Sequence, residues 1–191
     1  MRFDRARRGE GYTLIEALVV MLFVGIVIAL GLPALQQMIH RSRLEGTARE
    51  CAVMCQRARL EAIQQGAPTV LLIDTTNYRV RTWVDTDGDA QIDAGERVLV
   101  DQPLAGTVEV VGPSGTSPIE GFDTDTDGGW IVFNTDGSVT EEGNIHFGDS
   151  RGNFLRLRVS PRATAHVEIA KWDANQSEWV QPGEGKPWDW Q

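Results

Sequence analysis

Cysteine and histidine are scarce in this chain of 191 residues, which holds only two cysteines and three histidines. Two cysteines, Cys51 and Cys55, are too few for the disulfide framework of a small secreted domain. The histidines lie in three separate segments, and the sequence contains no zinc motif, phosphate loop or nucleophile elbow. We therefore predict a protein that is not an enzyme and requires no cofactor.

Basic residues are outnumbered, with 18 lysines and arginines against 27 acidic residues and a formal net charge of −9. Four of the arginines lie within residues 1–11, and without this segment the chain has 14 basic and 25 acidic side chains. A body this acidic repels phosphate backbones, because like charges oppose the approach of nucleic acid. General nucleic-acid binding is therefore disfavoured, and binding to nucleic acid would need a local basic patch.

One long apolar run follows the basic segment, from residue 12 to residue 35, and Glu16 is its single charged side chain. A helix of roughly 20 apolar residues is long enough to cross the hydrocarbon core of a membrane. A carboxylate in that environment is energetically costly unless something pairs with it. The run therefore predicts a membrane helix whose Glu16 has a partner.

The flanks of the run indicate its orientation and its processing. More arginines precede the run than follow it, which favours a cytoplasmic N-terminus. The small residue Gly11 stands before the apolar run, whereas an ordinary secretory signal carries its small-residue cleavage site after it. Cleavage after Gly11 would remove the charged segment 1–11 and keep the apolar helix. An uncleaved membrane anchor is the alternative.

The segment Gly11-Tyr12-Thr13-Leu14-Ile15-Glu16 and the apolar run resemble the class III prepilin signal of type IV pilins and type II secretion pseudopilins. Tyr12 stands where the family usually has phenylalanine. The resemblance implies that a prepilin peptidase cuts between Gly11 and Tyr12 and methylates the new N-terminus. It implies that Glu16 meets the free amino group of a neighbouring subunit, and that Pro33 lies where the family often kinks the helix.

A second helical pattern continues from residue 36 to residue 65. Its apolar and small residues recur at helical spacing and form one continuous seam. We expect the two cysteines of this seam to be small buried core residues, with a strained bridge or half of a metal site as alternatives. Gly66 and Pro68 predict the end of the helix. The seam comprises Leu44, Ala48, Cys51, Cys55, Ala58 and Ala62.

After Pro68 the apolar period changes to two, which is typical of strands. The turn pairs Asp136-Gly137 and Arg151-Gly152 predict hairpins. Short strands separated by turns favour an antiparallel sandwich over a parallel sheet. We therefore predict an α+β, pilin-like fold, in which a long N-terminal helix packs on a sandwich of about seven or eight strands. The expected strands are 70–73, 78–84, 97–100, 107–111, 130–133, 144–147, 154–160 and 164–170.

Two further segments resemble the GspH/FimT branch of minor pseudopilins, namely Ala58–Ile63 at the helix end and Trp130–Ser138 in the β region. The family often has Gly-Arg in its last hairpin, and this chain has Ser160–Thr164 there. The resemblance divides the chain into a leader (1–11), a membrane and assembly helix (12–35), its amphipathic continuation (36–65), a GspH-like β domain (66–170) and a tryptophan-rich tail (171–191).

An acidic loop runs from Asp85 to Glu96. Its carboxylates occupy positions 1, 3, 5, 9 and 12, which is the ligand spacing of an EF-hand calcium loop, and position 7 offers a backbone carbonyl. Ala90 stands at position 6, where glycine normally makes the sharp turn. The expected ligands of a calcium ion are Asp85, Asp87, Asp89, Gln91, Asp93 and Glu96; a solvated acidic turn is the alternative.

Two other segments have unusual compositions. Asp123–Gly128 repeats the first half of the acidic pattern without a twelfth-position acid, which favours a flexible loop. The tail carries four tryptophans, and exposed tryptophans are enriched at interfaces. Trp172 and Trp179 finish a last strand or hairpin, or the tail binds a partner; both interpretations are open. The four are Trp172, Trp179, Trp188 and Trp190.

The resemblance implies a non-catalytic minor pilin or pseudopilin that supports filament assembly and protein secretion in a type II secretion pseudopilus or type IV pilus. Its partners would be other pilins or pseudopilins, the prepilin peptidase and the bacterial inner membrane, crossed once with the C-terminal domain in the periplasm. The alternative is a minor pilin for DNA uptake. That role would require an exposed basic cluster, for which the candidates are Arg151, Arg156, Arg158 and Arg162.

Overall fold

The computed structural model describes residues 13–182, without the side chains at 33 and 34. The chain divides into two units, with the boundary between Ile39 and His40. The predicted cleavage site, Gly11 and Tyr12, lies outside the described residues. Trp188 and Trp190 of the tail lie outside them as well.

Helix α1 (Leu14–Gln65) has recognisable signals at both ends. The Glu16 amide donates hydrogen bonds to the backbone and side-chain oxygens of Thr13, at 3.1 and 3.3 Å, as expected of a helix N-cap. At the other end Gly66 has a φ of +65°, and its amide donates to the Ala62 carbonyl. Glycine adopts this left-handed conformation readily, so the helix ends there, as predicted.

The part of α1 in the first unit is apolar and exposed. Its most hydrophobic window of 18 residues has a mean hydropathy of 2.8, and none of that window is buried. Leu14 is 80% exposed and Leu30 is 75% exposed. By length and composition this helix is a candidate membrane span.

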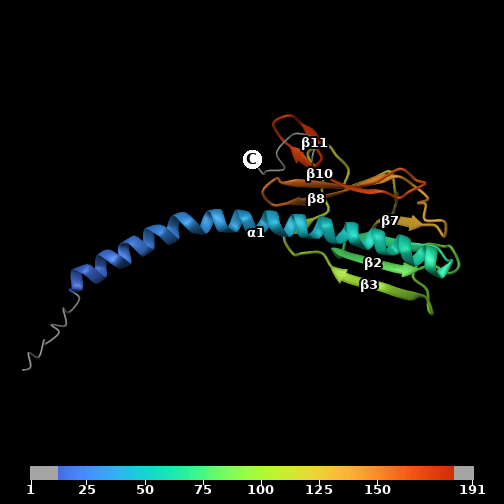
Figure 1. The fold of residues 1–191 in the computed structure, drawn as a ribbon, viewed down its shortest axis with the longest axis horizontal. Coiled ribbons are helices and arrows are strands. Elements are labelled where there is room, and N and C mark those ends of the chain that lie inside the picture. Colours follow the sequence, from blue (N-terminus) through green and yellow to red (C-terminus); the bar gives the residue numbers. More distant parts are fainter. Residues whose placement is uncertain (1–12, 183–191) are drawn as a thin grey trace, which may run out of the picture. The chain divides into compact units, whose positions relative to one another are not determined.

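The part of α1 in the second unit lies along the β-sheets (Figure 1). It packs on them through the predicted seam, all of which is buried. Most seam residues are alanine or cysteine, so the helix backbone can lie close to the strands. Two polar contacts add to this packing. The Arg59 guanidinium donates to the Gly137 carbonyl at 2.8 Å, and Arg97 pairs with Glu61 at 2.8 Å.

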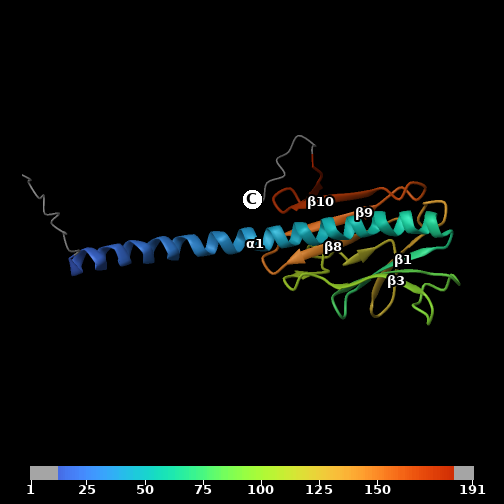
Figure 2. The same ribbon diagram turned by 60° about the horizontal axis from the view of Figure 1, so that its bottom comes forward.

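The first sheet has five strands in the order β3-β2-β1-β7-β6, and every pair is antiparallel. Strand β1 is central and pairs with β2 on one side and β7 on the other. In Figure 2, strands β1 and β3 of this sheet lie on the opposite side of the second half of α1 from β10. The bounds are β1 (Thr69–Asp74), β2 (Arg79–Val84), β3 (Arg97–Pro103), β6 (Asp123–Thr124) and β7 (Gly128–Phe133).

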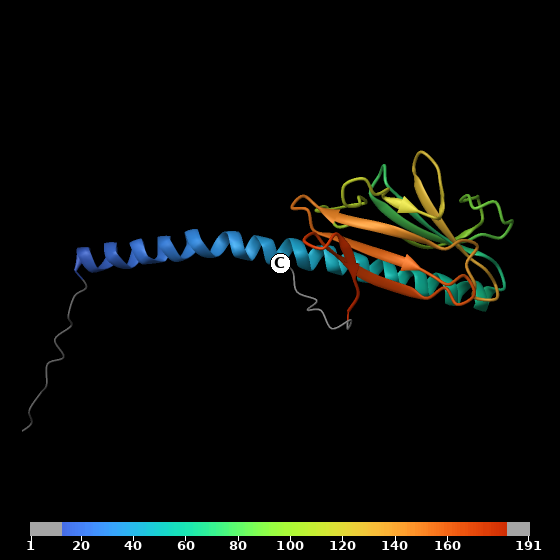
Figure 3. The same cartoon turned by 90° about the horizontal axis from the view of Figure 1, so that it is seen from above.

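The second sheet has six strands in the order β11-β10-β9-β8-β4, and β5 also pairs with β8. These pairs are antiparallel as well. Figure 3 shows its long strands beside the second half of the helix. The bounds are β4 (Val108–Glu109), β5 (Ile119–Glu120), β8 (Gly143–Asp149), β9 (Phe154–Val159), β10 (Val167–Asp173) and β11 (Glu178–Val180).

One hydrophobic core joins the second half of the helix to both sheets. Phe133 of the first sheet and Phe147 of the second are fully buried in the same cluster as the helix seam. The α+β class and the antiparallel strands predicted from the sequence are confirmed.

All eight expected segments contain a strand, but the described residues hold eleven strands, not seven or eight. Strands β5 and β6 have only two residues each, too few for an alternating pattern. The expected strand 164–170 begins later, at Val167, because the Thr164 and Ala165 amides donate to the Pro161 carbonyl in a turn. The turns at Gly137 and Gly152 have positive φ, +83° and +80°. The second joins the paired strands β8 and β9, as predicted, whereas the first pairs Phe133 with Val139 in an isolated bridge, and β7 and β8 lie in different sheets.

Gly128 tests how closely β1 and β7 approach each other. A Cβ at this position would collide with the backbone carbonyl of Ile73. We expect Gly128→Ala to lower the free energy of unfolding by about 2 kcal/mol or more, because a backbone atom cannot move aside cheaply. Urea denaturation of the detergent-solubilised chain measures this. Gly106→Ala is the matched control, since nothing lies within 4 Å of its Cβ, and equal midpoints for both variants would refute the prediction.

Candidate functional site

Glu16 lies in the first turn of α1, at the start of the exposed apolar segment. Its backbone amide is held by Thr13, so its place in the helix is fixed by the N-cap. A carboxylate in the first turn interacts favourably with the helix dipole. The described part of the first unit contains no other acidic side chain and no basic side chain, so Glu16 has no charged partner there.

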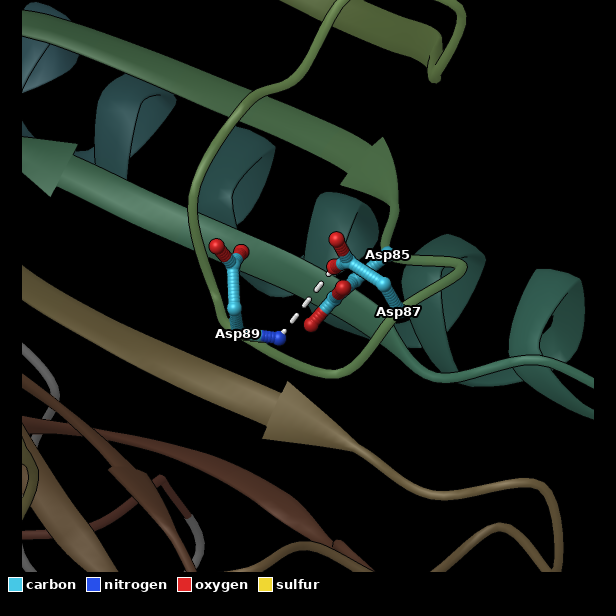
Figure 4. Close-up of side chains that lie close together, drawn as sticks. All are labelled: Asp85, Asp87 and Asp89. Carbon is cyan, nitrogen blue, oxygen red and sulfur yellow. Dashed lines mark hydrogen bonds between the residues drawn. The ribbon is translucent and has the colours of Figure 1, made fainter.

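The acidic loop Asp85–Glu96 connects β2 to β3. It begins at Asp85, whose amide donates to the Pro68 carbonyl at 2.9 Å, so its start is fastened to the chain entering β1. Asp85, Asp87 and Asp89 each offer a carboxylate oxygen within 4.8 Å of the others (Figure 4). The structure therefore brings together positions 1, 3 and 5 of the predicted calcium ligands.

Asp85 is buried and organises the turn. Its two oxygens accept hydrogen bonds from the Gly88 amide at 2.8 Å and the Ala90 amide at 3.0 Å. Ala90 has a φ of +59°, the left-handed conformation that glycine usually supplies. The sharp turn at the sixth position is therefore present although the residue is alanine.

Asp93 and Glu96 lie outside the group of three converging carboxylates. Hydrogen bonds hold the Gln91 carbonyl and the Glu96 carboxylate in place. The Gln91 carbonyl accepts a hydrogen bond from the indole of buried Trp83 at 3.0 Å. The Glu96 carboxylate accepts from the amides of Thr86 at 2.7 Å and Asp93 at 3.2 Å. The Thr86 amide is the main cause of the lowered pKa of Glu96. The loop is thus closed across its base by Glu96.

The crowding of carboxylates has an electrostatic consequence at Asp87. Desolvation in the crowded loop, followed by repulsion from the carboxylates of Asp89, Asp93 and Glu96, raises the pKa of Asp87. A bound cation would relieve this repulsion.

In the second acidic segment, Asp123–Gly128, a carboxylate accepts hydrogen bonds from backbone amides of the same segment. The Asp125 carboxylate accepts from the amides of Asp127 at 2.8 Å and Gly128 at 3.0 Å. Within residues 13–182, the Asp85 group is the one cluster of three carboxylates, thiols or imidazoles with the spacing of a metal site. Of the two acidic segments, we therefore consider only the loop Asp85–Glu96 as a candidate calcium site.

Trp172 and Trp179 lie opposite each other in the hairpin of β10 and β11. Trp179 stacks on His146 with ring centroids 5.2 Å apart, and its ring centroid lies 5.0 Å from the Arg156 guanidinium. Of the two interpretations open for these tryptophans, the structure supports the hairpin. The sequence did not reveal their contacts, because His146 and Arg156 come from strands β8 and β9.

The four arginines proposed as a basic cluster do not form an isolated basic patch. Arg156 lies against Trp179. The backbone amide of Arg162 donates to the Glu142 carboxylate at 2.9 Å, and this hydrogen bond is the largest cause of the lowered pKa of Glu142. The positive charges of Arg162 and Arg158 lower this pKa further. Arg151 lies in the turn between β8 and β9. DNA binding stays a prediction, and these contacts do not favour it.

The two cysteines are free thiols, buried in the helix seam as expected. Burial raises the pKa of Cys55 to about 12, and burial followed by repulsion from Cys55 raises the pKa of Cys51. Such thiols react slowly and are poor metal ligands, because the thiolate is the reactive form.

Comparison with known families gives a match to the family described as Type II transport protein GspH, over residues 47–163. The chain belongs to the GspH family. The match covers more than half of the chain, from the second half of α1 through β9. The tryptophan hairpin β10–β11 lies beyond the part that matches the GspH family.

Two solved structures of the minor pseudopilin EpsH from the type II secretion system of Vibrio cholerae are similar to this chain. One is 13% identical, with a TM-score of 0.47 over 74% of this chain and 99% of EpsH. The other is 12% identical, with a TM-score of 0.42 over 76% of this chain and 98% of EpsH. No match was found among curated proteins.

Proposed function

We propose that this chain is a minor pseudopilin, a non-catalytic subunit of a type II secretion pseudopilus that supports filament assembly and protein secretion. The observation that carries the proposal is the exposed apolar helix with Glu16 in its first turn, leading into a domain of the GspH family. An apolar surface this long requires either lipid or other apolar helices around it. In a filament subunit, lipid surrounds the helix before assembly, and the apolar helices of other subunits surround it in the filament.

The proposed processing follows from the same helix. The prepilin peptidase cuts between Gly11 and Tyr12, and the new amino group at Tyr12 is methylated. In the filament this ammonium lies beside the Glu16 carboxylate of a neighbouring subunit, so that each charge neutralises the other. Such a pair mainly sets the register between helices, because desolvation offsets much of the Coulomb attraction.

The proposed location is the bacterial inner membrane. The first unit crosses the membrane once, with the N-terminus in the cytoplasm before processing. The C-terminal domain is periplasmic. Its partners are other pseudopilins and the prepilin peptidase.

We further propose that the acidic loop binds calcium. Asp85, Asp87 and Asp89 would supply side-chain oxygens, Gln91 its carbonyl, and Asp93 and Glu96 the remaining carboxylates. The features that support the ion are the convergence of the first three carboxylates and the left-handed turn at Ala90. A hard cation with oxygen ligands suits this donor set.

The processing proposal predicts the mass of the mature protein. We expect the N-terminus to be methylated Tyr12 in cells with an active prepilin peptidase, and the full leader to remain when the peptidase gene is deleted. Intact-protein mass spectrometry measures this. Retention of Met1 or Arg2 in peptidase-positive cells would refute the pseudopilin proposal.

The assembly proposal predicts the effect of Glu16→Ala. The variant should keep the unfolding midpoint of the second unit, because Glu16 lies in the first unit. Its incorporation into sheared filaments should fall about tenfold or more, since the Tyr12 ammonium would lose its partner in a low-dielectric environment. Immunoblotting of the filament fraction measures this. Glu50→Ala, another exposed acidic residue of α1, is the control, and equal incorporation of both variants would contradict the assembly role.

The calcium proposal predicts binding with a dissociation constant of about 1 mM or below, in the range of extracellular modules. Asp87→Asn should weaken it about tenfold, because one carboxylate ligand is lost. Affinity should also fall as the pH is lowered, because protonation of Asp87 competes with the ion. Isothermal titration calorimetry measures both. Asp125→Asn in the second acidic segment should leave binding unchanged, and no heat with millimolar calcium would end this proposal.

A further inference from the structure

The second sheet carries a pocket on the face that points away from the core. Glu120, Asn144 and Arg158 lie opposite one another on the neighbouring strands β5, β8 and β9, so their side chains share one face of the sheet. Their neighbours in the sequence, Ile145 and Leu157, are buried in the core, so the face with Arg158 is the outer one. The pocket has a volume of about 320 Å³. Its lining consists of Glu120, Gly121, Glu142, Gly143, Asn144 and Arg158.

Hydrogen bonds hold both carboxylates of this pocket in place. The Glu142 carboxylate accepts from the Ser160 hydroxyl at 2.8 Å and from the backbone amide of Arg162 at 2.9 Å. These hydrogen bonds lower the pKa of Glu142, so its side chain is negatively charged at neutral pH. The Glu120 carboxylate accepts from the side-chain amide of Asn144 at 3.3 Å. Acceptors that are already held in place lose less side-chain entropy when a ligand binds.

Arg158 supplies the positive charge of the pocket, and its side chain is exposed. Glu168 lies directly opposite it in the register of β9 and β10, but the Glu168 carboxylate accepts the side-chain amide of Gln181 at 2.9 Å. The charge of Arg158 contributes to the lowered pKa of Glu142. Within residues 13–182, however, the Arg158 guanidinium forms no ion pair. The pocket therefore presents opposite charges that the fold does not join directly.

We propose that this pocket binds a small zwitterion, namely a free amino acid or a short peptide that carries both an ammonium and a carboxylate group. The ammonium would lie between the carboxylates of Glu120 and Glu142, because it has three donors and no acceptor. The ligand carboxylate would pair with Arg158, whose guanidinium can donate to both oxygens at once. The site is independent of the proposed function, since neither Glu16 nor the loop Asp85–Glu96 lines the pocket.

A zwitterion explains the pocket better than a metal ion or a nucleic acid does. The pocket has only two carboxylates, and the charge of Arg158 opposes a metal cation. In the part of the chain that the structure describes, the spacing of a metal site occurs at Asp85, Asp87 and Asp89, which belong to the loop between β2 and β3. The same two carboxylates repel the phosphates of a nucleic acid. A ligand with one charge of each sign matches both sides of the pocket.

Isothermal titration calorimetry of the detergent-solubilised full chain tests the ligand class. We expect alanine or the dipeptide dialanine to bind with a dissociation constant of about 1 mM or below. The tighter of the two distinguishes a free amino acid from a short peptide as the source of the zwitterion. The corresponding amides lack the carboxylate, and the N-acetyl derivatives lack the ammonium. Each analogue should bind about tenfold more weakly or less, because one charge-assisted contact is lost.

Two outcomes of this titration would overturn the proposal. The first is the absence of saturable binding of both alanine and dialanine at about 10 mM. The second is equal binding of a zwitterion and its amide, which would make the pocket a site for simple cations.

Substitutions in the pocket assign the two charges of the ligand. Arg158→Gln should weaken binding of the zwitterion about tenfold and leave binding of its amide unchanged, because the amide has no carboxylate for the guanidinium to hold. Glu120→Gln should weaken both, since both carry the ammonium. Arg151→Gln, at an exposed arginine in the turn between β8 and β9, is the matched control and should bind like the parent chain. Equal losses for Arg158→Gln and Arg151→Gln would refute the proposed site.

Discussion

The close packing of α1 on both sheets is the constraint on which the rest of the second unit depends. Alanine and cysteine line the buried side of the helix, so its backbone approaches the strands without the gap that longer side chains would impose. Small side chains bury little apolar surface, so each seam residue contributes little hydrophobic stabilisation. The bulk of the core is supplied by the sheets instead, through Phe133, Phe147 and their neighbours.

The two sides of the helix in the second unit differ in their contacts. The inner side is fixed by the core and by the contacts of Arg59 and Glu61 with the β domain. The outer side is free to carry apolar and basic residues that the fold does not need. In the same way the acidic loop is fastened at Asp85 and at Glu96 by hydrogen bonds, and its intervening carboxylates are exposed.

The sequence predicted those features that depend on local pattern. The helix end at Gly66, the buried seam and the hairpin turn at Gly152 follow from spacing and backbone preference, and they are confirmed. Features made by distant residues could not be predicted. The stacking of Trp179 on His146 joins β11 to β8, and the two-residue strands β5 and β6 exist only because longer strands hold them.

The acidic loop lies between these cases. The sequence showed the spacing of its calcium ligands, but alanine at the sixth position argued against the sharp turn. In the structure the buried Asp85 carboxylate nevertheless holds Ala90 in a left-handed conformation. A side chain five residues away thus replaced the glycine that the pattern lacked. Whether a backbone can adopt a strained turn depends on such hydrogen bonds, which a linear motif does not encode.

The two buried thiols have a consequence for where the domain can fold. Cys51 and Cys55 are protonated and sealed in the core, so oxidants and reductants in solution have little access to them. They are the only two cysteines of the chain, and both are free. Maturation of the domain therefore needs no thiol oxidoreductase, and its stability should be independent of the redox potential of the compartment it enters.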